Sequence, residues 1–80
     1  MWMSNLYVVV DPRNADRNSL NDIASAISET GATVLAIDEQ NHVIEAIAPT
    51  DAIATIRQMD GVAYVRGSFS YFKEAAQGAA

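Results

Sequence analysis

Two amphipathic segments, each ending at a glycine and each lying between two strand-like runs, restrict the fold of this chain more than any other feature. The first covers residues 19–31, where Leu20, Ile23 and Ile27 recur at helical spacing before Gly31. The second covers residues 49–61 and repeats the same spacing. The sequence therefore predicts one helix in each half of the chain.

Four runs rich in β-branched residues supply the predicted strands. They cover residues 5–10, 32–38, 42–48 and 62–66. The resulting order, β-α-β-β-α-β, is the α+β, ferredoxin-like pattern. Right-handed crossovers would then place both helices on one face of a four-stranded antiparallel sheet.

Three polar positions indicate where the predicted elements begin and turn. Ser19 is placed to cap the first helix, and Thr50 or Asp51 to cap the second. Between the second and third strands, the short connection at residues 39–41 predicts a hairpin, in which Asn41 can take the left-handed conformation.

Strict alternation along the predicted strands divides their residues between two faces of the sheet. The residues expected to form the core with the helices are Leu6, Val8, Val10, Leu35, Ile37, Ile44, Ala46, Ala63, Val65, Ile23, Ile27, Ile53, Ile56 and Met59. The opposite face, called the open face below, is expected to bind a partner through Tyr7, Val9, Val34, Val43, Glu45, Val62, Tyr64 and Arg66. A contiguous apolar surface of this kind is typical of a protein–protein contact.

Aromatic residues continue past the last predicted strand. The length of 80 residues allows one domain, which we place at residues 1–74 with an aromatic C-terminal extension, followed by a frayed tail at 75–80. The extension either extends the last strand, folds back over the open face, or binds a partner. The residues of this predicted partner-binding tail are Ser68, Phe69, Tyr71, Phe72 and Lys73.

Composition excludes several classes of function. There is no cysteine, the formal net charge is −5, and the five basic residues are scattered along the chain, so clustered positive charge for nucleic acid is missing. The apolar runs are too short to span a membrane, and no signal peptide is visible, so a cytoplasmic location is the default expectation. His42 is the single histidine and is expected to be a solvated hairpin residue. We therefore predict no catalytic residues, no metal site and no cofactor, and hence no enzyme.

Two segments carry a resemblance to a known family. They are "ISETGATV", where the first helix leads into the second strand, and "AIATIRQMDGVAYV", where the second helix leads into the last strand. With the strand "LYVVV", they resemble the subtilisin propeptide-like protease inhibitors over about residues 6–72. The resemblance implies a ferredoxin-like domain that chaperones and inhibits a subtilisin-like serine protease, packing its open face and extended tail on the enzyme. Where that family carries acidic residues after Val-x-Tyr-Val, this chain has Arg66, Gly67 and Ser68.

Two alternatives remain open at this level. An ACT-type domain, which binds amino acids, shares the strand order and the "ISETGATV" passage, although its usual glycine in the first loop is missing from "DPRNADRN". A structural module that self-associates through the open face fits the same apolar pattern.

Overall fold

The computed structural model describes residues 2–14 and 17–72. Lys73 and the predicted tail at 75–80 lie outside this part of the chain. The elements, in chain order, are β1 (Trp2–Val10), the 3-10 turn η1 (Pro12–Asn14), α1 (Arg17–Glu29), β2 (Thr33–Asp38), β3 (Val43–Pro49), the 3-10 turn η2 (Thr50–Ala52), α2 (Ile53–Arg57) and β4 (Val62–Phe72).

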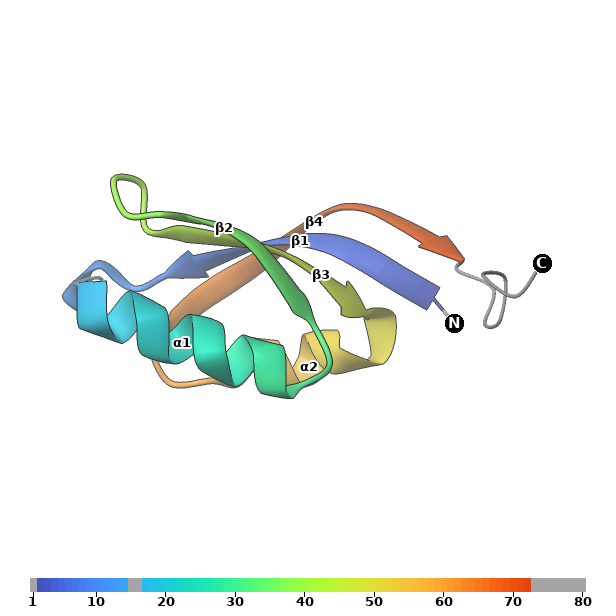
Figure 1. The fold of residues 1–80 in the computed structure, drawn as a ribbon, viewed down its shortest axis with the longest axis horizontal. Helices are drawn as coiled ribbons and strands as arrows, with labels where there is room; N and C mark the ends of the chain where they lie inside the picture. The colour runs from blue at the N-terminus through green and yellow to red at the C-terminus, as the bar shows by residue number, and fades with distance from the viewer. Residues whose placement is uncertain (1, 15–16, 73–80) are drawn as a thin grey trace.

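The sheet has the order β2-β3-β1-β4, and every pair of neighbouring strands is antiparallel. Both helices lie on the same side of this sheet, and the other face is uncovered (Figure 1). The architecture is an α+β arrangement of the ferredoxin-like type, as the sequence predicts. The strand β1 lies in the interior of the sheet, so it makes contact with both β3 and β4.

The core lies between the sheet and the two helices. Alternate residues of β1 and β3 point into it, since Leu6, Val8 and Val10 are at most 1% exposed and Ile44 is fully buried. From the helices, Ile27 and Ile56 are also fully buried, which confirms the amphipathic spacing of both segments. The buried hydrophobic residues are Leu6, Val8, Val10, Leu20, Ile23, Ala24, Ile27, Ala32, Ile44, Ala46, Ala48, Ala52 and Ile56.

A β-bulge in β2 corrects the predicted faces of that strand. Val34 pairs with the buried Ala46, and Ala36 pairs with Glu45, the residue before Ala46 in β3. Leu35 is therefore an extra residue without a partner on β3. Val34, expected on the open face, therefore packs against the core, whereas Leu35, expected in the core, is 50% exposed. Ile37 lies opposite a buried residue of β3, yet it is 36% exposed because β2 is an edge strand.

A second bulge, at the start of β4, corrects that strand in the same way. Val10 pairs with Val62 and the preceding residue of β1 pairs with Tyr64, so Ala63 is the extra residue. Val62, expected on the open face, packs against the core, and Ala63, expected in the core, is exposed. Beyond the bulge the alternation holds, with Val65 toward the core.

The helix starts also differ from the expected caps. The helix α1 begins at Arg17, so Ser19 lies in its first turn and not at its cap. The second helix is short and follows the 3-10 turn η2, and neither segment has a side-chain cap. The Thr50 hydroxyl instead lies 2.9 Å from the Oγ of Ser4, which is 1% exposed, and ties the turn to β1. The exit of α1 is as predicted, because Gly31 follows it with φ of 96°. The helix α2 ends earlier than predicted, at Arg57, so Gly61, with φ of 88°, lies in the turn before β4 and does not close the helix.

The β2–β3 hairpin is organised by Asp38. Its carboxylate accepts hydrogen bonds from the backbone N–H of Gln40 (3.0 Å) and Asn41 (3.0 Å), and from Asn41 Nδ2 (2.8 Å). The side-chain bond from Asn41, followed by the backbone bonds, lowers the pKa of Asp38 below its ordinary value. The left-handed residue is His42, with φ of 59°, and not Asn41 as expected. In this conformation the His42 carbonyl accepts the N–H of Val10 at 2.8 Å.

Replacing His42 with glycine is expected to stabilise the protein by about 0.5–1 kcal/mol, because glycine takes positive φ without the Cβ repulsion of other residues. Urea denaturation measures this change. The control is Gln40→Gly, two residues earlier in the same exposed turn and without a positive φ. Gln40→Gly should destabilise the protein, because its only effect is to raise the conformational entropy of the unfolded chain. A loss of stability in both variants would contradict the argument.

Candidate functional site

The open face of the sheet is the surface that the sequence identifies as a partner-binding site, and strand pairing arranges it in rows. One row runs across β3, β1 and β4 through Glu45, Tyr7 and Arg66, which are successive cross-strand partners. The next row runs through Val43, Val9 and Tyr64 in the same order. Six of the eight residues predicted for this face are therefore neighbours on it, and the other two, Val34 and Val62, belong to the core side.

The open face is hollowed beside the β2–β3 hairpin. The volume of this hollow is about 430 Å³. Its lining residues are Tyr7, Ala36, Asp38, Asn41, Val43, Glu45 and Arg66. Ala36 lies on the open face as alternation predicts, although it was not among the residues expected to bind a partner. Sequence reasoning missed Asp38 and Asn41 as part of this site. The paired turn signal of Asp38 and Asn41 was visible in the sequence, but not its proximity to the open face.

Charge is divided across this face. Glu45 on β3 is half-buried and Asp38 on β2 is exposed, and both lie on one side of β1. Arg66 is exposed on β4, on the other side of β1. Tyr7 lies between Glu45 and Arg66 in the row, and these two residues form no ion pair in the described part of the chain. The apolar centre of the face is thus flanked by a negative side and a positive side.

The predicted tail begins as part of the sheet. The strand β4 continues to Phe72, where its backbone lies opposite Trp2 at the start of β1, and a third bulge places Ser68 outside the pairing. Phe69 and Tyr71 are likewise paired with β1 through their backbone. The sequence left open whether these residues extend the last strand, fold back over the open face or bind a partner. Up to Phe72, the backbone extends the last strand.

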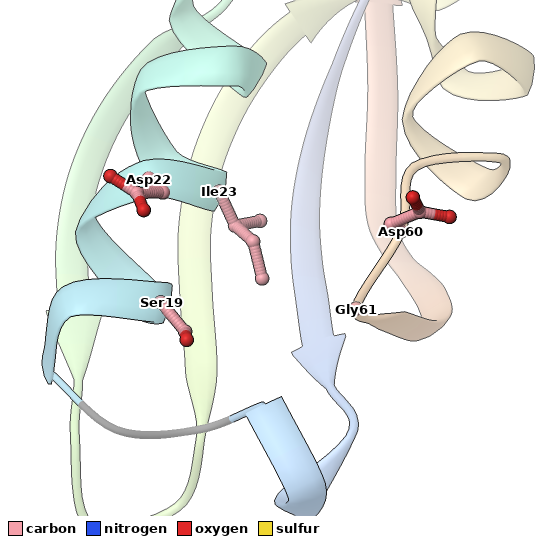
Figure 2. Close-up of a pocket in the computed structure, with 5 residues that line it drawn as sticks. All are labelled: Ser19, Asp22, Ile23, Asp60 and Gly61. Carbon is pink, nitrogen blue, oxygen red and sulfur yellow. The ribbon is translucent and has the colours of Figure 1, made fainter.

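A second hollow lies on the helical side, between α1 and the loop that precedes β4 (Figure 2). It is lined by Ser19, Asp22, Ile23, Asp60 and Gly61. The carboxylates of Asp22 and Asp60 point away from each other (Figure 2), so they do not converge on one ion. Within residues 2–14 and 17–72, no group of three or more His, Cys, Asp and Glu residues could hold a metal ion.

In the first strand–helix loop, where an ACT-type domain would bind its ligand, Arg13 and Asp11 bind each other. Arg13 donates to Asp11 from Nη2 at 2.9 Å and from Nε at 3.2 Å, and its backbone N–H donates at 3.0 Å. The side-chain hydrogen bond from Arg13 is the main reason why the pKa of Asp11 falls to about 2. The Arg13 side chain is 88% exposed, so added salt will weaken this pair.

Comparisons with known proteins leave the family of this chain open. No protein-family model matches it, and neither a curated protein nor a solved structure does. In the described part of the chain, no helix has the length and the apolar character needed to cross a membrane. The candidate site therefore rests on the geometry of the open face.

Proposed function

We propose that this protein is a non-enzymatic protein-binding domain that docks on its partner through the open face of the sheet. The observation that carries the proposal is the row of Val43, Val9 and Tyr64 beside the hollow on that face, in which the two valines are half-buried and Tyr64 is 53% exposed. Large aromatic side chains beside a concave surface are the usual anchors of protein interfaces.

The partner class that the sequence best fits is a subtilisin-like serine protease. The resemblance of residues 27–34 and 52–65 to inhibitory propeptides supports this choice. Arg66 follows Val-x-Tyr-Val where those propeptides carry acidic residues, so its contact on the enzyme would be a carboxylate and not a helix N-terminus. The chain after Phe72 would then reach the substrate cleft, while residues 69–72 stay paired with β1.

The purified protein is expected to inhibit a subtilisin-type protease, and Tyr64→Glu should weaken the inhibition at least about tenfold, because it places a desolvated charge in the interface. Inhibition constants measured with a chromogenic peptide substrate provide the test, and mass spectrometry follows trimming of the chain. The matched control is Ser25→Glu, which adds the same charge at an exposed position of α1 on the opposite side of the molecule. It should leave inhibition unchanged.

Two results would count against this proposal. An intact protein that the protease neither binds nor trims would exclude this partner class. Equal effects of Tyr64→Glu and Ser25→Glu on a measured inhibition would show that the open face is not the docking surface.

A further inference from the structure

The open face is complementary to itself. Glu45 lies one strand to one side of Tyr7, and Arg66 lies one strand to the other side, in the same row. A two-fold axis that runs parallel to β1 above Tyr7 places a second copy face to face with the first. The β3 side of the second copy then lies over the β4 side of the first. The axis therefore places Arg66 of the second copy over Glu45 of the first, and Glu45 of the second copy over Arg66 of the first.

The same two-fold axis also brings together compatible residues in the neighbouring row, which contains Val43, Val9 and Tyr64. Val9 would meet Val9 of the second copy on the axis, and Val43 would meet Tyr64. These contacts are apolar, and Tyr64 is 53% exposed in one molecule. Two sheets stacked in this way have strands aligned within about 30°, which is a common packing of antiparallel sheets.

The size of the face is adequate for a reversible dimer. With the axis above β1, only β3, β1 and β4 face strands of the second copy, and β2 lies outside the overlap. Three strands about 4.8 Å apart and nine residues in β1, each rising about 3.4 Å, give a flat area of roughly 440 Å². Standard interfaces bury about 800 Å² of accessible surface on each partner, and side chains that stand up from a sheet have more accessible area than its flat outline. Because the contact is smaller than a standard interface, we expect a weak dimer with a dissociation constant on the order of 100 µM.

We propose that the open face binds a second copy of this chain about a two-fold axis parallel to β1, with Glu45 and Arg66 forming two reciprocal ion pairs across the interface. The inference rests on the proposed function, because it names the partner of the same surface. A dimer of this kind covers the face that a protease would need, so dimer and inhibitory complex exclude each other. The dimer is then the state from which the inhibitor is released on dilution.

Charge reversal tests the proposed pairing. Sedimentation velocity from about 10 µM to about 1 mM spans the expected dissociation constant. Glu45→Arg or Arg66→Glu alone places like charges opposite each other at two points of the interface, so each should weaken dimerisation at least about tenfold. The double variant Glu45→Arg with Arg66→Glu restores both pairs with opposite polarity and should dimerise again. The control Arg57→Glu makes the same charge change at an exposed position of α2 and should dimerise as the wild type does.

The outcomes separate this inference from the proposed function. A wild type that stays monomeric, single variants that still dimerise, or a double variant that does not recover would each overturn the inference. Circular dichroism of every variant shows that a lost dimer is not a lost fold. A monomeric wild type that inhibits a protease would leave the proposed function standing. A dimer with charge-swap rescue and no inhibition would confirm the self-pairing and exclude the protease.

Discussion

Replacing Ile44 with alanine is expected to lower the free energy of unfolding by about 3–4 kcal/mol, whereas Ile37→Ala is expected to lower it by less than about 1 kcal/mol. The two residues are cross-strand partners in the same hairpin. Ile44 is fully buried in the core, so its truncation removes apolar contacts and leaves a cavity. Ile37 is 36% exposed on an edge strand, where water and neighbouring side chains can fill the space.

Urea denaturation of both variants measures this difference. A domain of 80 residues has a stability of about 4–12 kcal/mol, so Ile44→Ala should remove a large share of it and shift the transition midpoint visibly. Because the two substitutions delete the same atoms, the difference between them reports burial alone. Equal losses at the two positions would mean that β2 packs against the core more closely than the structure indicates.

Removing residues 69–80 is expected to destabilise the protein by about 2–4 kcal/mol, and not merely to remove a binding tail. This truncation deletes the four residues of β4 that pair with Trp2, Met3, Ser4 and Asn5 of β1. It leaves one side of the first half of β1 without backbone partners, and each lost pair weakens the sheet by several tenths of a kcal/mol or more.

The matched control is a protein that ends at Phe72, which keeps every described pair between β1 and β4. It should unfold at the same urea concentration as the full chain. The two truncations also separate an effect on inhibition from an effect on stability. If residues after Phe72 enter a protease cleft, the protein that ends at Phe72 loses inhibition without a change in stability. Equal stability of both truncated proteins would show that the end of β4 contributes little to the fold.

The order of the elements could be predicted from the sequence because it depends on hydrophobic spacing and on two glycines. Gly31 and Gly61 end their segments with the positive φ that other residues avoid. Burial of Ile27 and Ile56 follows from helical spacing alone. These signals are local, so no knowledge of the sheet was needed to interpret them.

The faces of β2 and of the start of β4 could not be predicted in the same way. Alternation assigns faces only while pairing is regular, and a bulge shifts the assignment of the residues on one side of it. Leu35 and Ala63 are apolar like their neighbours, so their residue types do not indicate a bulge. The strands β1 and β3 pair without a register shift. At Tyr7 and Glu45, the predicted face is therefore the one that the structure shows.

The candidate site was predictable to the same extent as the sheet. Its apolar centre and its charged pair lie on strands with regular alternation near β1, so spacing alone identifies them. The contribution of Asp38 and Asn41 depends on hydrogen bonds within the turn, which hold the hairpin beside the face. The opposition of Glu45 and Arg66 across Tyr7 depends on the register of three strands, which no single segment encodes.

The interior position of β1 has a consequence for how the chain reaches its native state. This strand is synthesised before both of its neighbours, which come from residues 43–49 and 62–72. Such distant pairing gives a high contact order, and proteins of this kind fold in milliseconds to seconds. Until β4 is synthesised, the apolar run from Leu6 to Val10 has one open edge and can pair with another chain. Crowding of nascent chains is therefore the condition in which this protein is most exposed to aggregation.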